Sequence, residues 1–159
     1  MRVLALDLGS RRIGVAVGAT GSSLAFPRPF VAGSRNRREV HRRIAALVAE
    51  EEAEVVVVGL PRSLDGRLGP AAQRALADIE ALRAVLDVPV ETHDERLTTV
   101  AADRALAAAG TTTRERRAAI DSTAAAVLLE SWLATRHARS APAGRQRRPR
   151  CAENGATTA

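Results

Sequence analysis

The run 3–8 is apolar on both faces of an expected strand, and Asp7 is its only charged residue. Such a strand must be covered on both sides, as in a sheet with helices packed on both faces. A carboxylate at the end of a buried strand is costly unless it is hydrogen-bonded, paired or bound to a metal. Asp7 is therefore either a turn residue that caps Gly9-Ser10 or a metal-binding carboxylate.

Hydrophobic spacing and turn residues predict the elements of the rest of the chain. Two further strands precede the first helix, and Pro27 and Pro29 place the second of these strands at a sheet edge. The expected strands cover 1–8, 13–17, 24–31, 55–58 and 88–92, and the expected helices cover 37–52, 70–85, 98–109 and about 112–136. This order predicts an α/β fold: a mixed five-stranded sheet, with an antiparallel meander followed by parallel strands, and helices on both faces.

Composition and charge limit the partners of the chain. Aromatic residues make up only 2% of the sequence, so the core must be built from Val, Leu, Ile and Ala. The net charge is +6, every basic residue is arginine, and most of the excess lies from Arg136 onward. We expect residues 1–136 to form one domain and 137–159 to form an Arg-rich tail. The tail is either disordered or able to contact phosphates.

Three features that the sequence lacks indicate the cellular compartment in which the protein is expected. No apolar run reaches the ~18 residues of a membrane span, and the N-terminus lacks the pattern of a secretory signal. The single Cys151 cannot form an internal disulfide. These features predict a cytoplasmic protein without a membrane partner.

Further acidic residues follow the later elements. Asp94-Glu95 come directly after the strand at 88–92, where the ends of neighbouring strands meet. Asp121 lies inside the last helix, on a stripe otherwise formed by Ala125, Leu128 and Trp132. Asp94-Glu95 could instead be an acidic loop before a helix, and Asp121 could pair with an arginine. Strand alternation leaves open whether Asp94 or Glu95 points toward Asp7.

If the sheet is built as predicted, three carboxylates from distant segments meet at one end. Hard oxygen ligands of this kind suit Mg²⁺ or Mn²⁺. Two such ions can activate a water and stabilise the leaving oxygen of a phosphodiester. The histidines His41, His93 and His137 are scattered, with no Cys/His cluster for zinc, and each is expected to be a surface or structural residue.

Four arginines flank the same end of the predicted sheet. Arg11 lies in the first turn, and Arg96 follows Glu95. Arg62 and Arg67 lie in the loop after the strand 55–58. All four are candidates for phosphate contacts, with solvated loop residues as the alternative.

Four sequence blocks together resemble the YqgF/RuvX family. The resemblance implies an RNase H-like fold related to Holliday-junction resolvases, and a metal-dependent nuclease that matures the 5′ end of pre-16S ribosomal RNA. It implies Asp7, Glu95 and Asp121 as catalytic metal ligands, with Asp94 as the alternate to Glu95. The blocks are Leu4-Ala5-Leu6-Asp7-Leu8-Gly9-Ser10 with the residues to Ala16, Val58-Gly59-Leu60-Pro61 with Asp65-Gly66, Asp94-Glu95-Arg96-Leu97-Thr98-Thr99, and Ile120-Asp121-Ser122-Thr123-Ala124-Ala125 with Leu128-Leu129.

One departure from the resolvases and three alternative functions accompany this resemblance. The resolvases carry an acid at the end of the strand that corresponds to 55–58, whereas this chain has Gly59-Leu60-Pro61 there, which raises the importance of Glu95 or Asp94. The alternatives are a Holliday-junction resolvase acting on branched DNA, a non-catalytic RNA-binding ribosome-assembly factor, and a fragment of an actin-like ATPase. The last is disfavoured because such ATPases need two duplicated halves. A monomer or a homodimer is expected.

Overall fold

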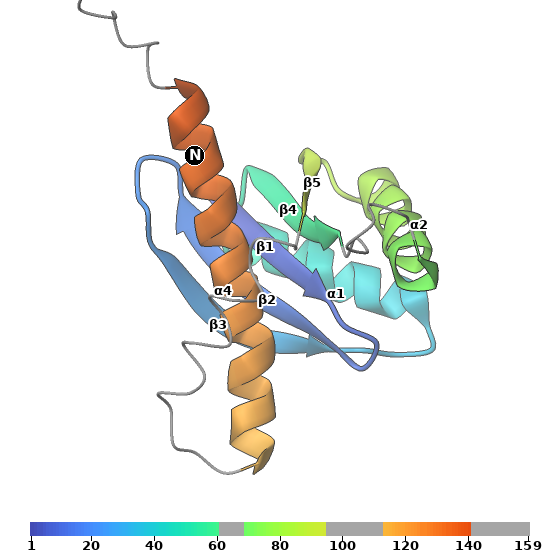
Figure 1. Cartoon of the computed structure of the whole chain (residues 1–159). Coiled ribbons are helices and arrows are strands. Elements are labelled where there is room, and N and C mark those ends of the chain that lie inside the picture. Colours follow the sequence, from blue (N-terminus) through green and yellow to red (C-terminus); the bar gives the residue numbers. More distant parts are fainter. Residues whose placement is uncertain (61–68, 95–112, 141–159) are drawn as a thin grey trace, which may run out of the picture.

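The structure is a computed structural model that describes residues 1–60, 69–94 and 113–140 of the 159-residue chain (Figure 1). Five strands form one sheet in the order β3-β2-β1-β4-β5. The first three strands pair antiparallel, and β4 and β5 continue the sheet parallel to β1. The predicted mixed sheet is confirmed. The elements are β1 (Arg2–Leu8), β2 (Arg12–Ala19), β3 (Ala25–Ala32), α1 (Arg37–Glu50), β4 (Val55–Leu60), α2 (Pro70–Val85), β5 (Val90–Asp94) and α4 (Thr113–Ser140).

Helices cover both faces of the sheet. Figure 1 shows α4 lying across one face, with α1 and α2 on the other. Leu4 and Leu6 of β1 belong to the core beneath α1 and α2, whereas Val3 and Ala5 pack under α4. The valines of β4 divide between the two cores in the same way. The central strands are therefore buried on both sides, which explains why their sequences are continuously apolar.

Small residues let α4 approach the sheet closely. Ala125 is fully buried, and a Cβ atom added to Gly18 on β2 would lie 3.1 Å from Cδ2 of Leu129. A larger residue at Gly18 would crowd both the Leu129 side chain of α4 and the Leu24 carbonyl oxygen. None of the described helices is both long and apolar enough to cross a membrane.

Several predicted boundaries shifted, most clearly those of β5 and of the last helix. β5 covers 90–94 rather than 88–92, because Pro89 has no N–H to donate to the ladder and pairing starts after it. Asp94 is consequently the last residue of a strand and not part of a loop. The last helix continues to Ser140, past the expected end at 136. The helix expected at 98–109 and the chain after Ser140 lie outside the described residues.

Candidate active site

Asp7 lies near the carboxyl end of β1 and is half-buried. The N–H of Gly9 donates a hydrogen bond of 3.0 Å to the Asp7 carbonyl, so the turn is closed through the main chain. Residues at odd positions of β1 pack under α4. Strand alternation therefore places Asp7 on the α4 face of the sheet.

The positions beside Asp7 on this face are glycines. Gly14 of β2 lies directly opposite Asp7, and the β2–β3 register shifts between Ile13 and Val15, that is, around Gly14. On the other side, Leu6 pairs with Val58, which puts Gly59 of β4 next to Asp7. Neither neighbour carries a side chain. Asp7 thus has more lateral space on its row of the sheet than it would have between two larger residues.

The same row continues to His93, which pairs with Gly59. Two strand spacings separate Asp7 from His93, or about 10 Å between their Cα atoms. Nε2 of His93 lies 2.9 Å from Oγ of Ser131 on α4, so this side chain also points to the α4 face. Burial lowers the pKa of His93, with a further lowering by Arg139 that Asp94 opposes.

Asp94 and Glu95 are distinguished by this alternation. Glu91 and His93 both contact α4, whereas Val90 belongs to the core under α1 and α2. Asp94 is four residues from Val90, so strand alternation places its side chain on the same face as Val90, away from α4. Glu95 is the next residue that would share a face with His93 if the strand continued, but it lies outside the described residues.

Asp121 lies on α4, one helical turn before Ala125. Ala125, Leu128 and Trp132 are buried against the sheet, as the predicted stripe requires. The side chain of Asp121 lies outside what the structure describes. Among the side chains that are described, no three of His, Cys, Asp or Glu gather closely enough to hold a metal ion.

The predicted arginines are described only in part. Arg11 is exposed in the β1–β2 turn, whereas Arg62, Arg67 and Arg96 lie outside the described residues. Next to Arg11, the guanidinium of Arg12 stacks on the ring of Phe30, with 4.6 Å between its carbon and the ring centroid. This contact packs the start of β2 against β3.

Comparison with known proteins decides the family. The model of the RuvX family, described as Holliday junction resolvase, matches residues 1–135. The chain belongs to the RuvX family. A relative from Mycobacterium sp. (strain KMS), named "Putative pre-16S rRNA nuclease", is 46% identical over 144 residues, which cover 90% of this chain and 85% of the relative. A relative of the same name from Mycobacterium tuberculosis (strain ATCC 25618 / H37Rv) is 49% identical over 133 residues, covering 83% and 78%.

Solved structures support the fold assigned to this RuvX chain. The T. thermophilus RuvC in complex with a Holliday junction substrate aligns with a TM-score of 0.53 and 19% sequence identity, covering 87% of this chain and 96% of that chain. A second T. thermophilus RuvC structure aligns with a TM-score of 0.52 and 18% identity, covering 87% and 97%. The RNase H-like architecture expected from the sequence is confirmed.

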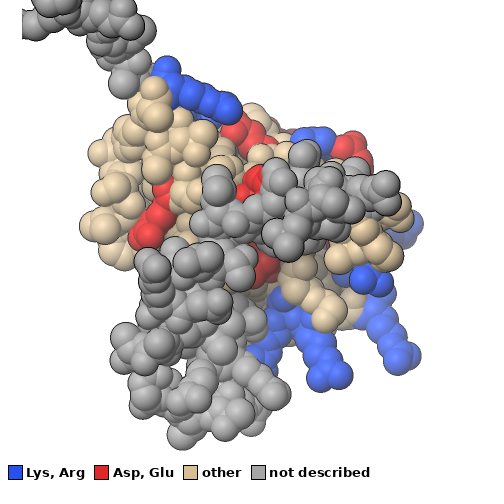
Figure 2. Space-filling model, in the orientation of Figure 1, with Lys and Arg blue, Asp and Glu red and all other residues tan. Residues whose placement is uncertain are grey.

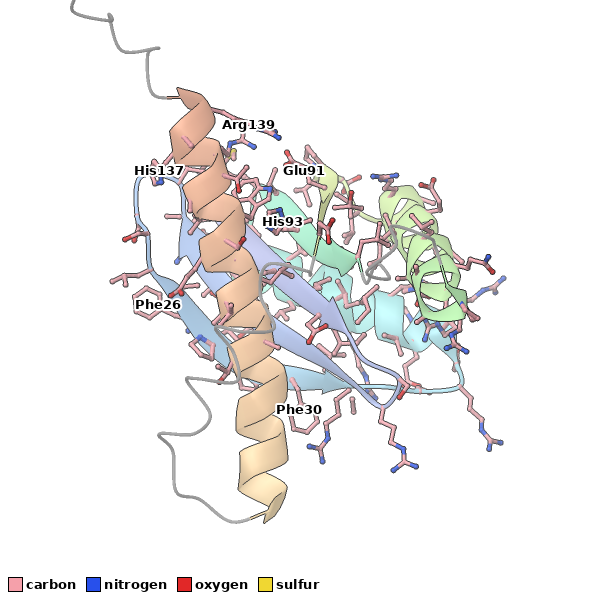
Figure 3. The ribbon with its side chains drawn as sticks, in the orientation of Figure 1. Phe26, Phe30, Glu91, His93, His137 and Arg139 are labelled. Carbon is pink, nitrogen blue, oxygen red and sulfur yellow. The ribbon has the colours of Figure 1, made fainter. Side chains whose placement is uncertain are left out.

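A polar network joins β5 to α4 on the side of the sheet where Asp7 lies. Figure 3 shows Glu91 and His93 beside the helix. Glu91 accepts hydrogen bonds from Nε1 of Trp132 at 3.1 Å and from Nη1 of Arg136 at 3.3 Å. Together with Thr135 and Arg139, these groups line a cavity of about 370 Å³. His93 connects the same two elements separately, through Ser131 of α4.

Sequence reasoning overlooked two features of the site. The glycines beside Asp7 have no local signature, because their significance depends on strand register. The contact between Glu91 and Trp132 spans 41 residues and leaves no local pattern either. Sequence reasoning also overlooked the accumulation of arginines between 35 and 43, although it is visible in the sequence as a dense run.

Proposed function

We propose that this RuvX-family chain is a metal-dependent endonuclease that acts in 5′-end maturation of pre-16S ribosomal RNA. The observation that carries the proposal is Asp7, a carboxylate between Gly14 and Gly59 at the carboxyl end of the central strand. Two relatives that match most of their own length bear the name of a pre-16S rRNA nuclease. The proposed location is the cytoplasm, in keeping with the single Cys151.

The proposed metal ligands are Asp7, Glu95 and Asp121. Carboxylate oxygens are the donors that Mg²⁺ and Mn²⁺ prefer. Asp7 fits such a role because neither neighbour on its row carries a side chain that would compete for the space. The position of α4 also fits, because Asp121 precedes the buried Ala125 by about one helical turn. A divalent ion held there would activate a water and stabilise the leaving oxygen of the phosphodiester.

We assign the middle carboxylate to Glu95 rather than Asp94. The support for Glu95 is the alternation of side chains along β5, in which Glu91 and His93 both contact α4. Continued alternation would bring Glu95 to the face of Asp7. Because Gly59 has no carboxylate, the middle metal ligand would have to come from β5 or from the residues that follow it.

The remaining protein groups would position the substrate. Arg11, Arg62, Arg67 and Arg96 are proposed to contact phosphates, since guanidinium groups form paired hydrogen bonds with phosphate oxygens. Arg11 is exposed in the turn that follows Asp7, which is consistent with this role. His93 is proposed to orient the β5 end through Ser131 and not to bind the metal.

The direct test is cleavage of a pre-16S 5′ fragment in Mg²⁺ and in Mn²⁺. Asp7→Asn should lower the rate at least about 100-fold, because it removes the charge of a proposed metal ligand. Asp87→Asn, at an exposed position between α2 and β5, is the matched control and should leave the rate unchanged. A wild-type protein inactive in both metals, or an Asp7→Asn variant with full activity, would rule out the proposal.

A second candidate is a resolvase that cuts branched DNA. The family description and the fold shared with RuvC favour it. It would use the same carboxylates but require two sites, and therefore a homodimer rather than a monomer. Selective cleavage of four-way junctions by a dimer would support this function, and a monomer that ignores junctions would exclude it.

A further inference from the structure

The arginines of the described chain differ in their partners from one end of the sheet to the other. At the amino end of β1, Arg2 pairs with Glu52 at 2.9 Å and Arg28 with Glu51 at 2.5 Å. Arg83, in the last turn of α2, pairs with Glu80 and donates to the Val90 carbonyl at the start of β5. Five exposed arginines near the other end make no ion pair within the described residues. They are Arg11, Arg35, Arg38, Arg42 and Arg74, and we name them the arginine surface.

One hydrogen bond, one helical spacing and one cavity relate the members of the arginine surface. The N–H of Gly33 donates to the Arg11 carbonyl at 2.9 Å, which ties the β1–β2 turn to the segment before α1. Arg38 and Arg42 lie one turn apart on α1, on the side away from the buried Val40 and Ile44. A cavity of about 560 Å³ joins the β1 end to α1 and α2. It is lined by Leu8, Gly9, Ser10, Arg37, Ala71, Arg74, Ala75, Ala77 and Asp78.

Not every arginine here is available to a ligand. Arg37 forms an ion pair with Asp78 inside the cavity, so its charge is already balanced. Arg74 lines the same cavity without such a partner among the described residues. Figure 2 shows the blue side chains gathering at the lower right, where Figure 1 places the β1–β2 turn and the start of α1.

At the opposite end of the molecule, ion pairs balance most of the charge. Glu50, Glu51, Glu52 and Glu54 gather where α1 ends and β4 begins, and Glu52 and Glu54 are exposed. The arginine surface therefore offers a polyanion positive charge that is not paired among the described residues, whereas three of these glutamates are paired with Arg2, Arg28 and the N-terminal amine. The arginine surface lies at the carboxyl end of β1, which also carries Asp7.

The chemistry of the arginine surface favours phosphates over bases. Single-strand binders stack bases on exposed aromatic rings. Among the described residues the only exposed aromatic side chain is Phe26, which lies beside Glu51 at the opposite end of the sheet. Phe30 is half-buried and covered by Arg12. Double-stranded RNA, by contrast, is recognised largely through its shape and its phosphates.

We propose that the arginine surface binds the phosphate backbone of double-helical RNA. A duplex flank of the substrate is held there, while the strand to be cut reaches Asp7. The choice of RNA rests on the proposed function, whereas the phosphate contacts rest on the charge and position of the five side chains. Recognition is independent of base sequence and weakens with salt, because each contact releases a counterion.

The test is binding of a labelled 20-base-pair RNA duplex to the full chain in EDTA, across a series of salt concentrations. Arg38→Gln/Arg42→Gln should weaken binding about tenfold or more at 0.1 M salt and reduce the salt slope by about 2. Arg2→Gln/Arg83→Gln removes the same charge from the other end and should change affinity less than about twofold. Circular dichroism checks that both double variants are folded.

Three results would overturn the arginine surface as a duplex site. They are equal losses in the two double variants, tighter binding of the single strand than of the duplex, and equal binding to phosphatidylserine vesicles. Cleavage assays separate this proposal from the proposed function. Loss of duplex binding in Arg38→Gln/Arg42→Gln supports the arginine surface even if the wild type cuts no RNA. Unchanged duplex binding rejects it even if the wild type is an active nuclease.

Discussion

Glu91 Oε2 accepts a hydrogen bond from Trp132 Nε1 across 3.1 Å, and this bond joins β5 to α4. The guanidinium of Arg136 lies over the indole ring, 4.9 Å from its centroid, and donates to the other oxygen of Glu91. β5 leads into Glu95, and α4 carries Asp121. The contact therefore helps to set how the two elements that supply the proposed metal ligands lie relative to each other.

Trp132 should stabilise the fold mainly through burial of its ring, because it is only 5% exposed. Trp132→Ala should lower the free energy of unfolding by about 3–5 kcal/mol. Trp132→Phe keeps most of the ring and loses the N–H, and it should cost about 1–2 kcal/mol. Urea unfolding of both variants measures the difference, and equal losses would contradict the dominant role of ring burial.

Gly9 should be essential to the turn that follows Asp7. A Cβ atom at Gly9 would lie 2.3 Å from the Arg12 carbonyl oxygen, so Gly9→Ala requires a backbone shift. We expect a loss of about 1–3 kcal/mol in stability, as for other overpacked sites, together with reduced cleavage.

Gly21→Ala is the matched control for Gly9→Ala. Gly21 has a φ of 95° but no atom within 4 Å of the added Cβ, so its cost comes from backbone strain alone. Gly21 lies in the turn after β2, at the other end of the sheet, so cleavage should be unaffected. Thermal unfolding and cleavage rates of both variants check this, and a Gly9→Ala variant with wild-type activity would contradict it.

His41 should make stability depend on pH. Burial lowers the pKa of His41, and the nearby Arg37 lowers it further. Because the unfolded pKa is about 6.5, the unfolded state binds more protons than the fold as the pH drops. The free energy of unfolding should therefore fall as the pH drops from about 7 through 6.5, and level off below the folded pKa.

Substitution of His41 tests this pH dependence. His41→Gln should show a smaller decrease in the free energy of unfolding between pH 7 and pH 5 than the wild type. His137→Gln changes an exposed histidine on α4 and should keep the wild-type decrease. Urea unfolding at a series of pH values gives both slopes, and an unaltered slope in His41→Gln would exclude this histidine as a source.

The proposed preference for Glu95 over Asp94 predicts unequal effects of two similar substitutions. Glu95→Gln should reduce cleavage at least about 100-fold and weaken Mn²⁺ binding, because it removes a ligand. Asp94→Asn should reduce cleavage by much less, since this residue alternates away from the α4 face. Calorimetric titration with Mn²⁺ provides a readout apart from activity, and the reverse order would reassign the ligand to Asp94.

Local pattern accounts for much of the fold. Val55–Leu60 is buried throughout, as its apolar run indicates, and the helical spacing of Val40, Ile44 and Val48 matches the buried side of α1. The prolines of β3 correctly indicated an edge strand. The shift of β5 was missed because Pro89 interrupts a run that is otherwise apolar. Pairing follows the available N–H groups, whereas the prediction followed hydrophobicity.

The sequence by itself determined the strands, the helices and the candidate acids, because periodicity and burial cost are properties of short segments. Only the tertiary structure decided that Gly14 and Gly59 flank Asp7 and that Asp94 has the parity of the α1 and α2 face. It also brought arginines from the β1–β2 turn, α1 and α2 to one end of the sheet. These relationships depend on strand register and helix packing, which arise from contacts between residues far apart in the chain.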